Sequence, residues 1–393
     1  MRYGSTGFTK SMKKALVIVF SNLRHDARVM RQIGFLSPQF TTTVVALENN
    51  PAGNHEFIQL PDLNLSLLRK AGIAFWSLIG KYRKAWEIFH PYKNISRELN
   101  KKSWDLIVAN DVEALPMAFD IAHSNTKIIL DAHEYSPRHF DDKLWWKIIF
   151  QPINVWTCET FIPLTHAMFT VGEGLAKEYA NNFDCKPVVI TNAPPFKNIS
   201  SEQPNSDQIR LVHHGIANPS RKLELMFDVM QKLDSRFTLD LYLMTSPYAS
   251  QKTKNWINEI TARFRSDSRI KVLPPLEQKD LIGTLSHYDI GIFLLPPENF
   301  NYANALPNKF FDFIQARLAV AIGPSPEMAG YVKKFHNGIV SKDFTPEALA
   351  ESLQRLTTED LKAMKLNSER AASELCAEKN EVIFNSTLQP LFT

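Results

Sequence analysis

The sequence predicts an α/β protein built from two doubly wound domains in tandem. Short apolar runs alternate with helical stretches along the chain, a pattern typical of mostly parallel sheets with helices on both faces. The alternation pauses once, at Asn192–Ser206, where Pro194, Pro195 and Pro204 lie among Asn, Ser and Lys residues and predict a linker. The length of 393 residues fits two domains of about 150–200 residues each better than one.

In the first half, six short apolar runs predict strands, and the stretches Arg28–Leu36 and Glu173–Asn181 predict helices. The expected strands are Ala15–Phe20, Thr42–Ala46, Asp105–Ala109, Lys127–Leu130, Ala167–Val171 and Pro187–Ile190. Lys13 and Lys14 imitate the start of a signal peptide, but the apolar run after them is short and lacks a small-residue cleavage site, which favours a buried strand. We expect the polar residues 1–12 to form a mobile arm.

The alternation restarts after the linker, with helices expected at Leu223–Leu233, Lys254–Arg265 and Pro346–Leu356. Five further strands are expected at Ile209–His213, Thr238–Met244, Arg269–Leu273, Asp289–Leu295 and Leu318–Ile322. Open α/β sheets bind ligands beyond the carboxyl ends of their strands. Two such domains that face each other would therefore place a ligand cleft between them.

Composition excludes several classes of protein. Hydrophobic residues make up 44% of the chain and charged residues 22%, as in ordinary globular proteins, and the net charge of +4 does not argue for nucleic acid. The three cysteines form no CxxC pair, so neither a zinc site nor a disulfide framework is indicated, and a reducing cytosol fits best. No apolar run reaches the roughly 18–20 residues of a membrane span, and no P-loop, GxSxG or GxGxxG motif occurs.

The most informative segment covers residues 301–312 and leads into an expected helix, Lys309–Ala316. A helix start offers free N–H groups and the positive end of the helix dipole, and both suit phosphate. Lys309 adds a full positive charge, and Asp312, one turn further on, can share its face and accept two ribose hydroxyls. Spacing alone is equally consistent with a plain helix start that carries a surface Lys–Asp pair.

Two other segments follow expected strands. In His213–Lys222, the cations Arg221 and Lys222 lie at a helix start and suit a diphosphate, although a solvated basic turn is an equal alternative. In Asp131–Tyr135, the side chains at the strand end are expected to point into the cleft. A single histidine there, His133, is more often an ordinary hydrogen-bonded residue than a catalytic one.

These segments resemble the motif blocks of GT-B glycosyltransferases, in particular the retaining glycosyltransferase family 4. The run from Pro307 to Phe313, followed by Leu318-Ala319-Val320-Ala321, resembles the family's PNKLFEY…AAGKPVVA block. The resemblance implies that Asp312 holds the nucleotide ribose and that the preceding loop wraps the diphosphate and the sugar. The implied nucleotide-sugar contacts in this block are Asn304, Ala305, Leu306, Asn308, Lys309 and Asp312.

The chain departs from this block at three positions. Asp312 replaces the usual Glu, Arg317 stands where Gly is usual, and Asn304 takes the place of the first Glu of the family's Glu-x(7)-Glu pair. The segment His213–Lys222 resembles the family's GR…KG block: Gly215 matches it, and Ile216 stands where Arg often occurs. Arg221 matches the basic residue and Lys222 replaces the Gly, so the resemblance implies that Gly215, Arg221 and Lys222 contact the donor.

Three blocks of the first half complete the resemblance. Asp131–Tyr135 resembles DxHE, which implies that His133 faces the donor sugar and that Glu134 orients His133 or touches the acceptor, while Asp131 is equally a structural cap. Asp26–Arg31 resembles DPRVRRE; Asp26 favours an N-cap, and Arg28 could reach phosphate or acceptor. Asn110–Glu113 resembles HANDxxTLP, which places Asp111 on the acceptor side.

The resemblance implies two Rossmann-like domains of the GT-B fold facing a central cleft. An acceptor-side domain would cover residues 1–195 and a donor domain residues 196–370, with residues 371–393 packing back on the first domain. The implied reaction transfers a hexose-type sugar, with retention, to a saccharide or lipid-linked saccharide in bacterial-type cell-surface polysaccharide or glycoconjugate synthesis. His133, Arg221 and Lys309 are the expected catalytic residues, with neither a cofactor nor a metal. Two alternatives stay open: a catalytically silent sugar-nucleotide-binding or scaffold subunit, and a sugar-nucleotide epimerase.

Residues 68–97 combine aromatic and basic side chains at helical spacing. The apolar members are Phe75, Leu78, Ile79, Tyr82, Trp86 and Phe89, and the basic ones are Arg69, Lys70, Lys81, Arg83, Lys84, Lys93 and Arg97. The pattern indicates either an amphipathic helix packed on its own domain or a surface for anionic lipid or a lipid-linked acceptor, which Trp145–Phe150 could extend. We expect a cytoplasmic protein with peripheral contact to the inner face of the cell membrane, and no nucleic-acid partner.

Overall fold

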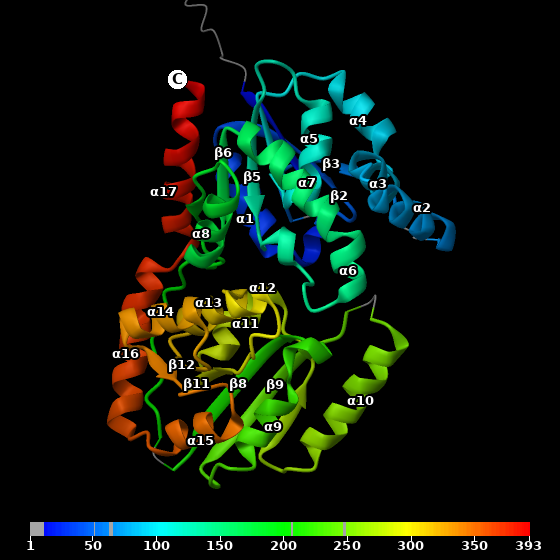
Figure 1. The fold of residues 1–393 in the computed structure, drawn as a ribbon. Helices are drawn as coiled ribbons and strands as arrows, with labels where there is room; N and C mark the ends of the chain where they lie inside the picture. The colour runs from blue at the N-terminus through cyan, green and yellow to red at the C-terminus, as the bar shows by residue number, and fades with distance from the viewer. Residues whose placement is uncertain (1–11, 51, 63–65, 206, 247–248) are drawn as a thin grey trace, which may run out of the picture. The chain divides into compact units, whose positions relative to one another are not determined.

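Two parallel sheets organise the computed structural model of the chain, which describes residues 12–50, 52–62, 66–205, 207–246 and 249–393 (Figure 1). The first unit contains the residues up to Val171 together with Leu175–Ile190 and Ile383–Thr393. The second unit contains Gly172–Gly174 and Thr191–Val382. The arm expected at residues 1–12 lies outside the described residues except for Met12.

The first unit has a seven-stranded parallel sheet with the strand order β3-β2-β1-β4-β5-β6-β7. Its strands are β1 (Lys13–Ile18), β2 (Phe40–Ala46), β3 (Glu56–Gln59), β4 (Leu106–Asn110), β5 (Lys127–Ala132), β6 (Ala167–Thr170) and β7 (Val188–Val189). The apolar runs of β1, β4 and β5 are buried, as expected for parallel strands covered on both faces. The direction of strand order changes between β1 and β4, and ligands of open α/β sheets bind at such a point.

Helices cover this sheet, among them α1 (Ala27–Leu36), α5 (Leu115–Ile121), α7 (Gln151–Phe161) and α8 (Glu173–Asn182). The carboxylate of Asp26 accepts a hydrogen bond from the Val29 amide at 3.1 Å, which confirms the N-cap interpretation of Asp26. The last helix, α17 (Ala377–Leu388), adds Phe384 to the core of this unit. The ring of Phe384 lies 5.7 Å from that of Phe35 and 5.1 Å from that of Phe169.

Residues 67–100 form three helices rather than the single amphipathic helix expected at 68–97. They are α2 (Leu67–Leu78), α3 (Tyr82–Phe89) and α4 (Lys93–Asn100). Gly80, with φ of +73°, ends the first helix, and Pro91 separates the second from the third, since proline lacks the N–H that a helix interior needs. The short helix α6 (Leu144–Ile149) lies against α2, where Ser77 Oγ donates to the Ile149 carbonyl at 2.6 Å.

The second unit has a six-stranded parallel sheet with the strand order β10-β9-β8-β11-β12-β13. Its strands are β8 (Ile209–Ile216), β9 (Phe237–Met244), β10 (Ile270–Leu273), β11 (Ile290–Phe293), β12 (Ala319–Ile322) and β13 (Gly338–Val340). Together the two sheets confirm the predicted α/β class. All eleven expected strands overlap observed ones. The edge strands β3 and β13 were not expected: each holds only two apolar residues, and none of its residues is fully buried.

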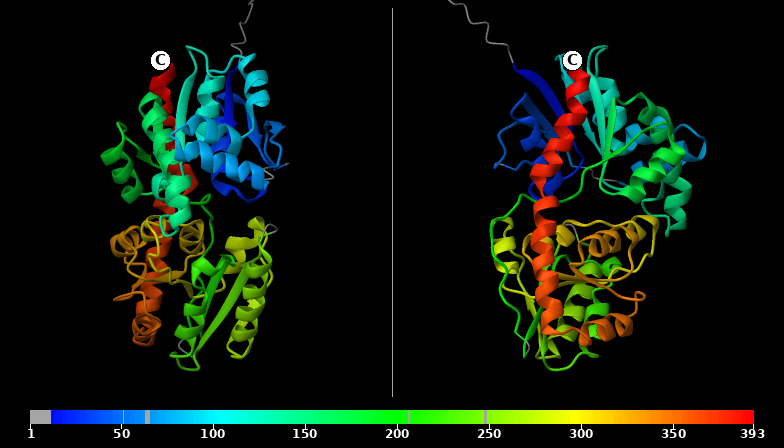
Figure 2. Two further views of the ribbon diagram at one scale, coloured as in Figure 1. Left: turned by 45° about the vertical axis from the view of Figure 1, so that its right-hand side comes forward. Right: turned by 90° about the vertical axis from the view of Figure 1, so that its left-hand side faces the viewer.

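Helices lie on both faces of the second sheet, as the turned views of Figure 2 also show. One apolar core lies under α9 (Glu224–Met230), α10 (Gln251–Arg265) and α15 (Pro346–Gln354). The other core lies under α11 (Gln278–Leu285), α13 (Asn308–Gln315), α14 (Pro326–Phe335) and part of α16 (Thr358–Glu374). The strand order changes direction between β8 and β11, which makes the carboxyl ends of these two strands the expected ligand-binding edge.

Candidate functional site

In the second unit, Lys309 lies at this edge of the sheet, in the first turn of α13. Its side chain is buried, with 8% exposed, and Nζ lies 4.4 Å from the centre of the Phe293 ring at the end of β11. Nζ is 3.0 Å from Nε2 of His213, a fully buried residue of β8. The other ring nitrogen of His213, Nδ1, lies 2.9 Å from the Ile292 carbonyl, which can only accept a hydrogen bond. Nδ1 therefore carries the proton, and Nε2 accepts from Lys309.

The electrostatics of this site favour an anion. Burial, and then the nearby Arg221 guanidinium, hold the pKa of Lys309 well below its usual range, against the opposing effect of Asp312. Burial and the Lys309 charge likewise hold the pKa of His213 well below its usual range. Because the surroundings disfavour the charged form of Lys309, an anionic ligand that pairs with it would remove this penalty.

Gly215 and Asp312 lie beside Lys309. Gly215 has φ of +129°, and a Cβ added to it would lie 3.0 Å from Lys309 Nζ, so the absence of a side chain lets the β8 backbone approach the ammonium. Asp312 is buried one turn along α13, and its Oδ2 lies 3.4 Å from Nε2 of His214. Burial, followed by the charge of Lys309, lowers the pKa of His214 to about 3, so His214 is neutral and this contact is not an ion pair near neutral pH.

Arg221 and Lys222 end the short 3-10 helix Pro219–Arg221 that follows β8. The Arg221 guanidinium lies over the ring of Tyr302, 5.3 Å from its centre, and the Tyr302 hydroxyl is 2.6 Å from Ser220 Oγ. Lys222 instead pairs with Glu298 at 2.9 Å. Arg221 is thus held near Lys309 by an aromatic ring, whereas the Lys222 ammonium already has an acidic partner.

Two departures from the family pattern share one backbone property. Lys222 and Arg317 stand where the resembled blocks have Gly, and both adopt positive φ, +50° and +63°. These are left-handed conformations that Gly adopts without steric cost. Arg317 is buried, and its guanidinium donates to the carbonyls of Gln315 and Lys197, each at 2.6 Å. These hydrogen bonds offset the backbone strain at Arg317 and explain how a large residue occupies that turn.

The remaining predicted donor contacts belong to the loop before α13. Asn304 ends the short helix α12 (Phe300–Ala303), where its Nδ2 donates to the Phe300 carbonyl at 2.9 Å. Ala305 is half-buried, Leu306 is buried, and Asn308 is exposed at the first position of α13. One N–H of the Asn304 amide therefore closes its own helix, and Oδ1 lies close to Gly174, where an added Cβ would be 2.5 Å away.

In the first unit, His133 follows β5 and lies between two carboxylates. Its backbone amide donates to Asp111 Oδ1 at 2.8 Å, its Nδ1 lies 3.4 Å from Asp111 Oδ2, and its Nε2 lies 3.7 Å from Asp131 Oδ2. Burial by itself would lower the pKa of His133, but Asp111 and Asp131 together outweigh it and raise the pKa to about 9. His133 is therefore a cation near neutral pH. Asp111 takes up φ of +61° at the end of β4, which turns it toward His133.

Arg28 and Asp131 form a buried ion pair behind His133, which differs from both roles considered in the sequence. The Arg28 guanidinium lies 2.5 Å from Asp131 Oδ1 and donates to the Ile190 carbonyl at 2.6 Å, and Gln32 donates to Asp131 Oδ2 at 2.9 Å. Burial would raise the pKa of Asp131, but the Arg28 charge outweighs it and holds the pKa below its usual range. Asp131 is thus no helix cap, and Arg28 supports the carboxylate that faces His133.

Glu134 pairs with a residue that sequence reasoning missed, His139, at 2.7 Å. Burial would lower the pKa of His139, but the hydrogen bond to Glu134 outweighs it and raises the pKa to about 9. Burial, followed by the charge of Asp111, raises the pKa of Glu113 to about 7. Asp111, Glu113, His133, Glu134 and His139 thus form one cluster of titratable groups in the first unit. Shifted pKa values of this kind often mark functional sites.

Sequence reasoning also missed His213, His214 and Tyr302, whose roles depend on contacts with residues far away in the chain. The part of the chain that the structure describes holds no group of three or more His, Cys, Asp or Glu residues placed to bind a metal ion. Across the same residues, no helix combines the length and the apolar character that crossing a membrane requires.

Comparisons with known proteins identify the fold. No protein-family model matches the chain, and no curated protein sequence matches it. Anabaena HepE in complex with UDP and glucose is similar to the chain, with a TM-score of 0.70 and 14% identity over 96% of this chain and 99% of that one. Sucrose-phosphate synthase of Thermosynechococcus elongatus gives a TM-score of 0.70, with 12% identity over 97% and 99% of the two chains. WaaG, a glycosyltransferase involved in lipopolysaccharide biosynthesis, gives a TM-score of 0.64, with 12% identity over 94% of this chain and 99% of that one. At these identities the likeness establishes the fold, which is the two-domain α/β fold of GT-B proteins.

Proposed function

We propose that the chain is a glycosyltransferase that moves a sugar from a nucleotide diphosphate sugar to a saccharide or lipid-linked saccharide acceptor. The observation that carries the proposal is the buried Lys309, held by His213 next to Gly215 at the start of a helix, in a chain with the GT-B fold. A lysine and free helix N–H groups are the chemistry that binds a diphosphate. HepE was crystallised with UDP-glucose, which makes UDP-glucose the first donor to test.

In the proposed reaction, the bond between the anomeric carbon and the diphosphate oxygen breaks, and negative charge develops on the leaving diphosphate. Lys309 and Arg221 would stabilise that charge, and they act more strongly in a buried site than in water. Asp312, buried on the same helix, would accept hydrogen bonds from the ribose hydroxyls. Because these two cations supply positive charge at the leaving group, we propose a reaction that needs no bound metal, which turnover that survives a chelator would support.

Retention of the anomeric configuration and a place in family 4 are proposals from the resemblance. In that scheme the acceptor attacks from the side on which the leaving group departs, and His133 faces the sugar. The charge of His133, imposed by Asp111 and Asp131, suits an oxygen that gains negative character. Product NMR that shows an inverted linkage would overturn retention.

One observation favours a second candidate, a sugar-nucleotide-binding subunit without turnover. Asn304 stands at the position of a sugar-contacting Glu, carries no charge, and uses its amide nitrogen to close α12. Such a subunit would bind UDP-glucose as tightly as an enzyme but release no UDP when acceptors are added. An epimerase would instead convert the donor sugar in the absence of any acceptor.

The decisive experiment measures donor binding and turnover separately, in the wild type and in Lys309→Met. Methionine is unbranched and one atom shorter than lysine, so it fills most of the same space without the charge. We expect UDP-glucose to raise the melting temperature of the wild type by mass action, and Lys309→Met to weaken UDP binding and abolish UDP release. Equal binding and equal turnover in the two proteins would remove Lys309 from the mechanism and leave the proposal without its main support.

We also propose peripheral contact with the inner face of the cell membrane, in keeping with a lipid-linked acceptor and cell-surface polysaccharide synthesis. The face formed by α2 and α6 carries large apolar side chains, of which Leu67 and Leu68 are 84% and 86% exposed. The other exposed members are Phe75, Leu78, Ile79, Leu144, Trp145 and Ile148. Exposed apolar side chains beside basic residues suit the interface of an anionic bilayer. Sedimentation with phosphatidylglycerol vesicles, compared between the wild type and Leu67→Ser/Leu68→Ser, tests this proposal.

A further inference from the structure

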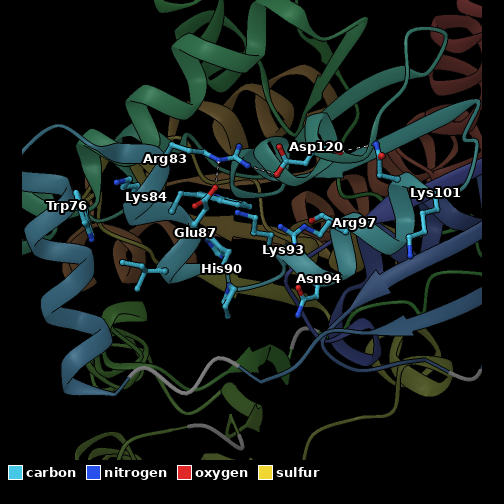
Figure 3. A pocket seen from close by; sticks show the side chains of 15 residues that line it. Trp76, Arg83, Lys84, Glu87, His90, Lys93, Asn94, Arg97, Lys101 and Asp120 are labelled. Carbon is cyan, nitrogen blue, oxygen red and sulfur yellow. Dashed lines mark hydrogen bonds and ion pairs between the residues drawn. The ribbon is translucent and has the colours of Figure 1, made fainter.

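A pocket of about 1050 Å³ lies in the first unit, where α3 and α4 form its main walls (Figure 3). The reaction proposed above uses none of its lining residues, although the sequence pattern of residues 68–97 includes several of them in a surface for anionic lipid or a lipid-linked acceptor. Trp76 of α2 and Asp120 of α5 complete the lining, and the charged side chains on the walls include Arg83, Glu87, Lys93 and Arg97. The pocket is large enough for several sugar rings, and its charges decide what it can hold.

The two acidic side chains of the pocket are already paired with a single arginine. Arg83 Nε lies 3.1 Å from Glu87 Oε1, and the same guanidinium pairs with Asp120. On the α4 wall, Lys93 and Arg97 are exposed, and neither side chain has an ion pair or hydrogen bond with any residue that the structure describes. Positive charge on the α4 wall is therefore not neutralised from within the pocket, which predicts an anionic ligand.

The spacing of the cations indicates an extended anion. Lys93, Arg97 and Lys101 lie four residues apart, on one face of α4 and at its C-terminal end, and all three line the pocket (Figure 3). Lys101 pairs with Glu98 at 2.7 Å, but both side chains are exposed, and such a surface ion pair is weak enough for an anionic ligand to displace. At about 1.5 Å of rise per residue, neighbours are about 6 Å apart along the axis and the set covers about 12 Å. A single phosphate would need cations that converge on one point. Cations in a row match a chain that carries charges at intervals.

The other lining residues favour a saccharide over a nucleic acid. Asn94 offers an amide donor and acceptor beside the cations. His90 lines the pocket at 5% exposure, and neither of its ring nitrogens has a hydrogen-bond partner among the described residues. Both nitrogens are buried and the ring stacks on Phe20 at 4.7 Å, so His90 forms part of the wall and is not a contact for the ligand. Little aromatic surface is left for base stacking among the described lining residues, because Lys84 covers one face of the Trp76 ring at 4.3 Å and Trp86 is buried.

We propose that this α3–α4 pocket binds an acidic saccharide chain, with carboxylate or phosphate groups along the row Lys93, Arg97 and Lys101 and sugar hydroxyls at Asn94. The inference rests on the proposed function, since it assigns the bound chain to the acceptor or product of sugar transfer. It adds the substrate class, which is a charged polysaccharide, and a second contact point for that chain on the first unit.

The test uses the full chain and size-defined oligogalacturonate as the probe, with an uncharged malto-oligosaccharide of equal length as the ligand control. We expect oligogalacturonate to bind and its affinity to fall as salt is added. The Lys93→Gln/Arg97→Gln variant should bind it with an affinity lower by a factor of about ten or more. The matched protein control, Lys252→Gln/Lys254→Gln, removes the same charge from exposed positions of α10 and should bind like the wild type. Circular dichroism confirms that both variants fold.

Three outcomes would overturn the inference: no binding of oligogalacturonate by the wild type, equal losses in the two variants, or equal affinity for the neutral oligosaccharide. A single-stranded DNA oligonucleotide or phosphatidylglycerol vesicles that alone show dependence on Lys93 and Arg97 would reassign the pocket to those ligands. A parallel titration with UDP separates the two proposals. If only the pocket inference is wrong, the wild type will still bind UDP. A wild type that does not bind UDP would contradict the proposed function itself.

Discussion

Lys309 and His213 lie 96 residues apart in the chain and meet through one hydrogen bond, from Nζ of the lysine to Nε2 of the imidazole at 3.0 Å. The Ile292 carbonyl holds the other side of the ring, so the imidazole presents an acceptor to the ammonium. The lysine thus has a fixed position before any ligand arrives, although its surroundings disfavour its charge.

The first prediction concerns protons that accompany donor binding. The pKa of Lys309 is well below its usual range in the free protein because of burial and Arg221, and a bound diphosphate would raise it. UDP should therefore bind with net uptake of up to about one proton, and more tightly as the pH falls, so long as the diphosphate itself stays ionised. Calorimetric titrations in two buffers of different ionisation enthalpy measure this uptake. The same titrations with Lys309→Met should show none from this site.

The second prediction separates the positioning role of His213 from a purely structural one. His213→Phe removes the acceptor for Lys309, and we expect kcat/KM to fall about 10- to 100-fold, which corresponds to about 1.4–2.7 kcal/mol. His213→Gln keeps an acceptor oxygen and should recover part of the loss. Replacement of the exposed His287 by Phe is the control. A merely structural role would give equal losses in His213→Phe and His213→Gln, with no change in the proton uptake on UDP binding.

The third prediction compares two glycines. In Gly215→Ala, the new Cβ would lie 3.0 Å from Lys309 Nζ on a backbone at φ of +129°, so we expect a stability loss of about 1–3 kcal/mol and weaker UDP binding. Gly34 lies within α1 with no atom within 4 Å of its added Cβ. Gly34→Ala should therefore gain about 0.5–1 kcal/mol and leave UDP binding unchanged. Urea unfolding and UDP titration of both variants would check this, and equal UDP affinities would show that close approach at Gly215 is unimportant.

The fourth prediction concerns the pH dependence of stability in the first unit. His133 has a folded-state pKa of about 9 against 6.5 in the unfolded chain, so its ion pairs stabilise the fold fully below pH 6.5 and lose this effect as pH rises through 9. The contribution is on the order of 2–3 kcal/mol at pH 6. The difference in unfolding free energy between wild type and His133→Gln should shrink from pH 6 to pH 10. A difference that does not change with pH would show that Asp111 and Asp131 do not raise this pKa.

The sequence predicts the sheets well, because buried parallel strands are written as continuous apolar runs such as Ala15–Ile18 and Ala319–Ile322. It also places Lys309 and Asp312 on one face of a helix. It could not predict what Lys309 contacts, since His213 comes from a distant strand and no local pattern records that pairing. The same holds for Arg28, whose partner Asp131 is 103 residues away. The local sequence around a cation near a strand end is the same whether the side chain faces solvent or a buried carboxylate.

The position of Phe384 determines which fragments of the chain can be expressed in soluble form. The first unit is completed by the last residues of the chain, where Phe384 fills the space between Phe35 and Phe169. A fragment that stops after Ile190 would leave these two rings open to water, and we expect it to aggregate when it is expressed alone. A fusion that joins residues 377–393 to the end of that fragment through a flexible spacer should restore its solubility. Deletions at the carboxyl end of the chain would therefore destabilise the first unit, although most of that unit comes from the amino-terminal half.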